Sequence, residues 1–132
     1  MAKLKVEFLQ QYYDANGVPF RAQLIARFTQ LSRLGMLMPS VYNFMVTNKV
    51  TSNLIKLATG FATERSLPTL SSQTLHHWFG SSYKQKTAHK KNVYLFCDEF
   101  TNYNDVAIGK KAIRLLEKLG YTVIIPQHLE RD

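Results

Sequence analysis

The stretch NVYLFCDEFTNYNDVAIGKKAIRLLEKLGYTVIIP, residues Asn92–Pro126, decides the predicted fold. Val93–Cys97 is a short apolar run, which is typical of a fully buried strand. Val106–Leu119 carries apolar residues at helical spacing, and Gly120 follows it where a helix-ending glycine is expected. Tyr121–Ile125 is rich in β-branched residues and stops at a proline. The stretch therefore predicts a strand, a helix and a second strand.

Two buried strands joined by a helix must run parallel, and the crossover between them should be right-handed. The loop Asp98–Asp105 follows the first strand, at the end of a parallel sheet where ligands bind. This loop is the candidate site, and its residues considered for ligand contact are Asp98, Glu99, Thr101, Asn102, Tyr103 and Asn104. The favoured interpretation is structural: the residues stiffen the loop, and Asn102, Asn104 or Asp105 caps the following helix.

Residues 1–79 precede this unit and show apolar residues at helical spacing, separated by turn signals. They predict an opening helix that closes near Asn16–Pro19, a second helix over Phe20–Leu37 and a third beginning at Pro39. A fourth helix is expected to be capped by Thr51 or Ser52 and ended by Gly60, and a last turn covers Gln73–Phe79. Residues 80–91 are polar and lysine-rich and predict a linker, with residues 92–132 as the β-α-β part.

The predicted fold class is α/β, a short helical segment followed by one right-handed β-α-β unit of an incomplete parallel sheet. Two strands do not make an independently stable sheet, and strands this apolar expect helices on both faces. The chain therefore looks like an excerpt from a larger protein. An exposed sheet edge would also allow two copies to pair as a homodimer.

The net charge of +8 is unevenly distributed. Residues 1–91 hold twelve Lys and Arg against three Asp and Glu, whereas residues 92–132 hold five against six. A basic half can favour nucleic acid, an anionic membrane surface or an acidic partner. Here the basic residues are scattered singly, which favours solvated helix faces and disfavours nucleic acid.

Targeting signals are weak in this sequence. No apolar run reaches the roughly 18 residues that span a bilayer, so a transmembrane protein is not expected. The single cysteine fits a reducing cytosol. The expected location is the cytoplasm, with the inner face of the membrane as a peripheral alternative.

The residues that most often carry chemistry have plain structural interpretations here. His76 and His77 are adjacent, so they point in different directions on a helix and make a poor chelating pair. Cys97 is flanked by Asp98 and Glu99, which should raise its pKa and leave a buried structural thiol. No glycine-rich fingerprint or nucleophile elbow is present. We assign no catalytic, cofactor-binding or metal-binding residue to this chain.

The sequence YLFCDEFTNYN at residues 94–104, with Gly109 and the closing LLEKLGYTVIIP, resembles the start of a cysteine-rich, CCG-type domain. That domain occurs in iron–sulfur oxidoreductases such as the glycolate oxidase iron–sulfur subunit, the anaerobic glycerol-3-phosphate dehydrogenase C subunit and heterodisulfide reductase. FTNY and VIIP look closest to fused, D-lactate (2-hydroxyacid) dehydrogenase-like proteins, which join an FAD-linked oxidase domain, a 4Fe-4S ferredoxin-like domain and a CCG domain.

The opening MAKLKVEFLQQYYDANGVPF is similar to the segment that follows the last ferredoxin cysteine in these fusions. RSLPTLSSQTLHHWF, residues 65–79, looks like their connector into the CCG domain. The resemblance thus covers nearly the whole chain. The paired cysteines of the CCG motif are not among residues 1–132, and Cys97 lies inside the expected strand, so cluster ligation is not carried over to it.

The resemblance implies a parent oxidoreductase that passes electrons from a 2-hydroxyacid, such as D-lactate or glycolate, through FAD and 4Fe-4S clusters to an acceptor. Its ferredoxin-like and FAD-linked oxidase domains would be the partners of this chain. The chain itself would act as a scaffold, with no cofactor of its own and no catalysis alone. The alternative is a small basic interaction or nucleic-acid-binding protein.

Overall fold

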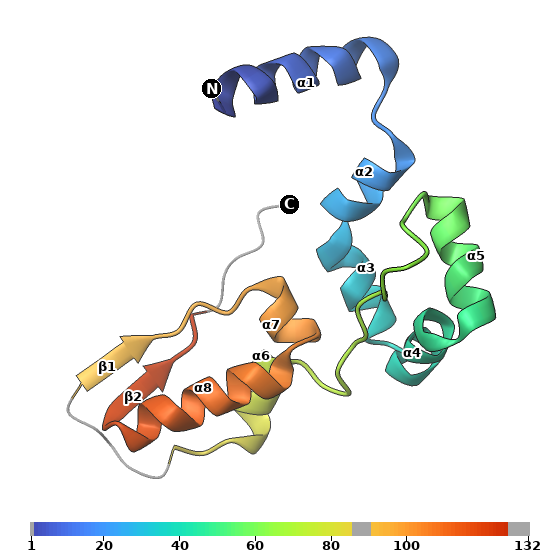
Figure 1. Ribbon diagram of the computed structural model, residues 1–132. Helices are drawn as coiled ribbons and strands as arrows, with labels where there is room; N and C mark the ends of the chain where they lie inside the picture. Colours follow the sequence, from blue (N-terminus) through green and yellow to red (C-terminus); the bar gives the residue numbers. More distant parts are fainter. Residues whose placement is uncertain (1, 86–90, 127–132) are drawn as a thin grey trace.

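The computed structural model describes residues 2–85 and 91–126 and arranges them as a helical part followed by a small α/β unit (Figure 1). The helical part contains α1 (Ala2–Asn16), α2 (Phe20–Ala26), α3 (Phe28–Gly35), α4 (Pro39–Thr47) and α5 (Lys49–Thr59). The short helix α6 (Leu75–His77) continues into one π-helical turn, η1 (Trp78–Ser82). The α/β unit contains β1 (Lys91–Tyr94), α7 (Glu99–Tyr103), α8 (Val106–Lys118) and β2 (Tyr121–Ile124).

The two strands form a parallel sheet, as the sequence predicts. Lys91 lies opposite Tyr121 at one end and Tyr94 lies opposite Ile124 at the other. Helix α8 connects the strands and packs along the sheet (Figure 1). The core beneath it is made of apolar side chains from α6, η1, α8 and both strand ends: Leu75, Trp78, Cys97, Val106, Ile113, Val123 and Ile125. The predicted α/β class, a helical segment followed by a β-α-β unit, is therefore confirmed.

The prediction of a fully buried first strand over Val93–Cys97 is wrong. Pairing begins at Lys91 and ends at Tyr94, and only alternate residues face the core. Cys97 is buried, whereas Tyr94 and Phe96 are 71% and 70% exposed. Successive side chains of extended backbone point to opposite faces, and within the described residues α8 covers one of these faces. The other face of the sheet carries exposed aromatic side chains.

Two of the predicted helix boundaries also differ from the structure. The expected helix over Phe20–Leu37 is interrupted at Arg27, which separates α2 from α3 with non-helical dihedral angles. Helix α5 begins at Lys49, before the predicted caps Thr51 and Ser52. The side chain of Asn48 caps it, accepting hydrogen bonds from the backbone N–H groups of Val50 and Thr51. Asn is among the best N-cap residues, and an earlier cap adds one turn to the helix.

Residues 69–75 join the helical part to the α/β unit. The Asn43 side chain makes two hydrogen bonds to the backbone of Leu70. Its Nδ2 donates to the Leu70 carbonyl and its Oδ1 accepts from the Leu70 N–H, each at 2.8 Å. The next residue, Ser71, donates from its N–H to the Tyr103 carbonyl at 2.8 Å and from its hydroxyl to the Asn104 carbonyl at 2.9 Å. A single short segment is thus hydrogen-bonded to α4 on one side and to the end of α7 on the other.

Some of the residues expected to form a linker, 80–91, make specific contacts with the rest of the chain. Tyr83 stacks on Trp78 with ring centroids 4.6 Å apart, and its hydroxyl donates to the Glu117 carboxylate. The Gln85 amide donates to the Val123 carbonyl at 2.5 Å. Residues 86–90 lie outside the described part of the chain.

Gly109 provides a test of the packing of α8. Its backbone lies so close to Leu75 and Thr101 that an added methyl group would overlap the Leu75 side chain, which is fully buried and has no room to move. We expect Gly109→Ala to lower the free energy of unfolding by about 1–3 kcal/mol, despite the better helix propensity of alanine. Urea denaturation followed by circular dichroism measures this change.

Gly80→Ala is the matched control, because nothing lies within 4 Å of the methyl group that it would add. We expect it to change stability by less than about 0.5 kcal/mol. Equal effects of the two substitutions would contradict the close packing of α8 on α6.

Candidate functional site

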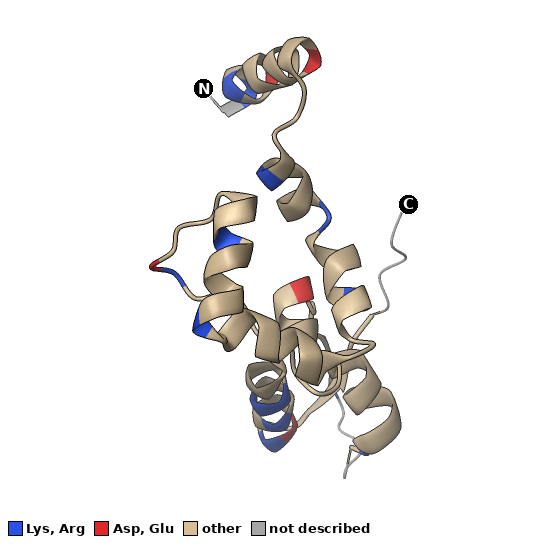
Figure 2. Ribbon diagram, turned by 90° about the vertical axis from the view of Figure 1, so that its right-hand side faces the viewer, with Lys and Arg blue, Asp and Glu red and all other residues tan. Residues whose placement is uncertain are grey.

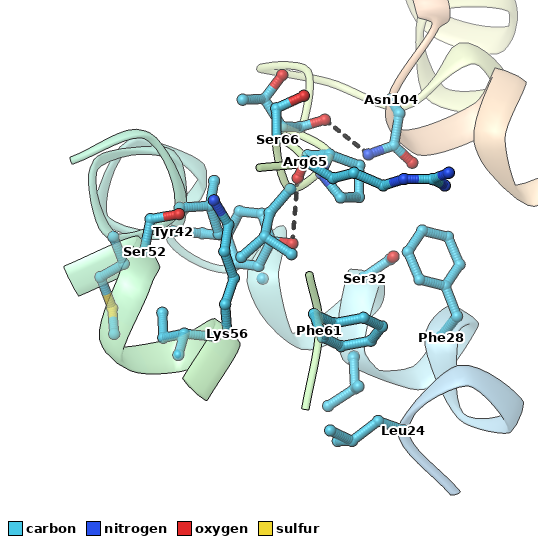
Figure 3. A pocket seen from close by; sticks show the side chains of 18 of the residues that line it. Leu24, Phe28, Ser32, Tyr42, Ser52, Lys56, Phe61, Arg65, Ser66 and Asn104 are labelled. Carbon is cyan, nitrogen blue, oxygen red and sulfur yellow. Dashed lines mark hydrogen bonds between the residues drawn. The ribbon is translucent and has the colours of Figure 1, made fainter. Parts of the chain in front are cut away.

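An apolar groove of about 1750 Å³ is the candidate site (Figure 3). Helices α2 and α3 form one wall, α4, α5 and residues 61–69 form the opposite wall, and the start of α7 closes one end. Apolar side chains dominate the lining: Leu24, Ile25, Phe28, Leu31, Met45, Val46, Ile55 and Phe61. Phe28 at its edge stacks on Phe100 of α7, with ring centroids 4.7 Å apart. The groove therefore lies where the helical part meets the α/β unit.

Polar residues also line this groove, and several of them are buried. Lys56 is only 7% exposed, and its ammonium donates to the Thr63 carbonyl, a neutral group, at 3.0 Å. Ser52, one helical turn earlier, and Ser32 on the opposite wall are each 4% exposed. The Tyr42 hydroxyl donates to the Pro68 carbonyl at 3.2 Å, and burial raises the pKa of this phenol. The lining thus combines an apolar surface with a buried cation.

The polar stretch that the sequence singles out, Asp98–Asp105, is a short helix and not a loop. Asp98 caps α7: its carboxylate accepts from the Thr101 N–H at 2.8 Å. The hydrogen bonds from Thr101 hold the pKa of this carboxyl below its usual range. Asp105 occupies the N-cap position of α8, but its side chain makes no capping hydrogen bond. The expectation that Asn102, Asn104 or Asp105 caps the following helix is therefore wrong, and the side-chain cap observed here is that of Asp98 on α7.

The other predicted site residues connect α7 to its neighbours. The Asn102 side chain accepts from the His76 N–H at 3.1 Å, which joins α7 to α6. Tyr103 is buried, and the Asn104 amide donates to the Thr69 carbonyl at 2.6 Å. The methyl group of Thr101 lies beside Gly109 of α8. These contacts give each residue a structural role, and ligand contact at them stays a prediction.

The groove brings together part of the predicted set with residues that the sequence analysis missed. Glu99 and Asn104 line it, together with Lys56 and Arg65 from the helical part. Figure 3 shows Arg65 extending into the groove between Phe28 and Asn104. The signal for Lys56 is available in the sequence: Ser52, Lys56 and Thr59 share one face of α5, where Ile55 also packs inward. A lysine on the inward face of a helix marks a buried cation.

Cys97 is confirmed as a buried thiol. It is 6% exposed, and burial raises its pKa to about 11, with smaller contributions from Asp98 and Glu99. Within residues 2–85 and 91–126, no group of three or more His, Cys, Asp or Glu side chains is placed to hold a metal ion. Nor is any helix of that part long and apolar enough to cross a membrane.

Comparisons with known proteins give weak similarity to dehydrogenases. The chain is 25% identical over 108 residues to the C subunit of the anaerobic glycerol-3-phosphate dehydrogenase of Escherichia coli strains K12 and O157:H7, covering 82% of this chain. It is 28% identical over 129 residues to the D-2-hydroxyglutarate dehydrogenase of Pantoea ananatis, covering 89% of this chain. The chain spans only 27% and 12% of the lengths of these curated relatives. No family model matches the sequence, and no solved structure matches it.

Asp98→Ala tests the cap of α7. Loss of a charged N-cap should lower the free energy of unfolding by about 1 kcal/mol at neutral pH. Because the pKa of Asp98 is depressed in the folded state, this difference is fully present above pH ~4 and is lost as the pH falls further, through the folded-state pKa. Thermal unfolding of both proteins across this pH range measures the effect. Asp105→Ala is the control and should have a smaller effect, since Asp105 makes no side-chain cap.

The reactivity of Cys97 tests its burial. With a thiol pKa of about 11, very little thiolate exists near pH 8. We expect iodoacetamide to label the folded protein at least ~100-fold more slowly than free cysteine at that pH. Labelling of the same protein in urea should be fast and serves as the control. Rapid labelling of the folded chain would contradict a buried thiol.

Proposed function

We propose that this chain is a scaffold segment of an FAD- and iron–sulfur-dependent oxidoreductase that takes electrons from a 2-hydroxyacid such as D-lactate or glycolate. Residues 1–79 connect a ferredoxin-like domain to the α/β unit, and residues 92–132 begin a CCG-type domain. The ferredoxin-like and FAD-linked oxidase domains are its partners.

One observation carries the proposal: the similarity to both dehydrogenases extends over most of the chain, 82% and 89%. These lengths are too great for the α/β unit alone, so the helical part must also be aligned. The relatives include the glycerol-3-phosphate dehydrogenase subunit, one of the proteins that YLFCDEFTNYN and LLEKLGYTVIIP resemble. The matches do not favour a nucleic-acid-binding protein.

The packing supports a role as part of a larger assembly. Tyr94 and Phe96 leave a strongly apolar sheet face exposed, and soluble monomers rarely keep such surface open. Further strands and helices of a CCG-type domain would cover this face. The residues present do not suit a cluster, because Cys97 is a buried, protonated thiol. In this proposal flavin and clusters supply the redox chemistry from other domains, and the chain holds those domains in position.

The test is purification of the tagged protein from its own organism at native expression level. We expect FAD, iron and acid-labile sulfide to be recovered with the chain, together with dye reduction on addition of D-lactate, glycolate or D-2-hydroxyglutarate. Native material without flavin or iron would contradict the parent activity. Stoichiometric FAD binding, or D-lactate oxidation, by the purified 132-residue chain alone would contradict the scaffold role.

A matched pair of variants tests the sheet face. Tyr94→Glu places a charge where we expect an apolar interface and should lower the recovery of flavin by about tenfold. Leu54→Glu changes an equally exposed leucine, 68% exposed on α5, and should leave recovery unchanged. Equal losses in both variants would contradict a specific role of this face.

A further inference from the structure

Helix α1 has an apolar stripe with no partner among the described residues of its own chain. Leu4, Phe8 and Tyr12 follow each other at four-residue spacing on one face and are 73%, 66% and 50% exposed. Figure 1 shows α1 projecting away from the rest of the molecule. A 15-residue helix is marginal in water when it packs against nothing. The stripe therefore requires a docking surface.

Helix α1 carries equal numbers of opposite charges, Lys3 and Lys5 against Glu7 and Asp14, whereas the helices that follow it are mainly basic. Residues 20–70 carry six Lys and Arg against the single carboxylate of Glu64. The remaining acidic residues of the basic half, Glu7 and Asp14, both lie on α1. By helical geometry they fall on the same side of the apolar stripe. Lys3 lies on that side as well and Lys5 on the other, so helix α1 offers an apolar stripe with two carboxylates and a lysine along one border.

The groove presents apolar and basic side chains that can contact the apolar stripe and the carboxylates of α1. Apolar side chains line both walls, Lys49, Lys56 and Arg65 line the α5 side, and Glu99 and Asp105 line the α7 end. Figure 2 shows further basic residues along α2 and α3. An amphipathic helix laid in such a groove buries its apolar stripe and places its carboxylates beside the cations.

Figure 1 shows that α1 points away from the groove of its own chain. Gly17 ends α1 with a φ of 79° and donates to the Tyr13 carbonyl at 2.8 Å. The Gln23 amide donates to the Val18 carbonyl at 3.0 Å, and Pro19 fixes the entry into α2. Because the connection between α1 and α2 is short and hydrogen-bonded, we expect α1 to dock on another copy of the chain and not to fold back onto its own groove.

We propose that α1 docks in the groove of a second copy of this chain, and that the two copies exchange their α1 helices reciprocally. The interface then consists of two equivalent contacts, each pairing the Leu4–Phe8–Tyr12 stripe of one copy with the groove of the other. This inference does not rest on the proposed redox function, and its test is a measurement of mass.

Size-exclusion chromatography with light scattering measures the state of the full chain and of four variants. We expect the wild-type chain to be a dimer. Phe8→Glu in the stripe and Ile25→Glu in the groove, where Ile25 is 56% exposed, should each raise the dimer dissociation constant by about 100-fold. Val6→Glu, on the opposite side of α1, and Leu57→Glu, on α5 outside the groove, are the controls and should remain dimeric.

A mixing experiment separates exchange from any other mode of pairing. The Phe8→Glu chain keeps an intact groove and the Ile25→Glu chain keeps an intact stripe, so an equimolar mixture should restore one of the two contacts. We expect a heterodimer from two variants that are each monomeric alone. If Ile25→Glu fails to fold by circular dichroism, Leu31→Glu, also in the groove lining, replaces it.

Three outcomes would overturn the proposal. A wild-type chain that is monomeric at all concentrations shows that α1 does not dock in trans. A dimer that survives both Phe8→Glu and Ile25→Glu places the interface elsewhere, for example at the sheet edge. A mixture of the two variants that stays monomeric shows that stripe and groove do not meet.

Discussion

The hydrogen bonding of residues 69–71 is the constraint on which the arrangement of the whole molecule depends. The Asn43 side chain of α4 is hydrogen-bonded to the backbone N–H and carbonyl of Leu70. The Asn104 side chain donates to the Thr69 carbonyl, and the Ser71 N–H donates to the Tyr103 carbonyl. Leu70 itself is 4% exposed and contacts Gly35 so closely that a methyl group there would lie 2.5 Å from its side chain. Buried backbone groups must be paired, so this irregular segment has few alternative conformations. It sets the position of the α/β unit against the helices and thereby the width of the groove.

The remainder of the chain is far less tightly packed. Its accessible surface is 10518 Å², whereas a compact monomer of 15.2 kDa exposes about 7,100 Å². Exposed large apolar side chains lie on α1, in the groove and on the second face of the sheet. Such surfaces are unfavourable in water, and a covering partner removes that cost. The tightly bonded centre and the open periphery are consistent with a segment that holds other parts in place.

The sequence predicts the parallel strand–helix–strand unit well, because its apolar spacing and its glycine and proline signals are local. It does not predict correctly which side chains of the first strand are buried. Burial of Tyr94 and Phe96 depends on how many layers cover the sheet, and a residue pattern does not contain that information. The Asn43 and Asn104 contacts are also beyond sequence reasoning, since their partners lie 27 and 35 residues away. A cap at Asp98 could have been predicted, because Asp98 precedes Glu99 in a first helical turn.

The fate of the predicted site residues shows how a polar stretch at the end of a parallel strand can be used in two ways. Asp98, Asn102 and Asn104 have the side chains expected of a ligand site, yet their oxygens and amides are occupied by a cap, by the His76 N–H and by the Thr69 carbonyl. A ligand at this edge would compete with the contacts that join α7 to residues 69–76. The Asn104 side-chain oxygen is the exception: it is buried, and within the described residues it has no hydrogen-bond partner. Because a buried acceptor without a donor is costly, this oxygen is a point at which the hydrogen bonding around α7 is incomplete.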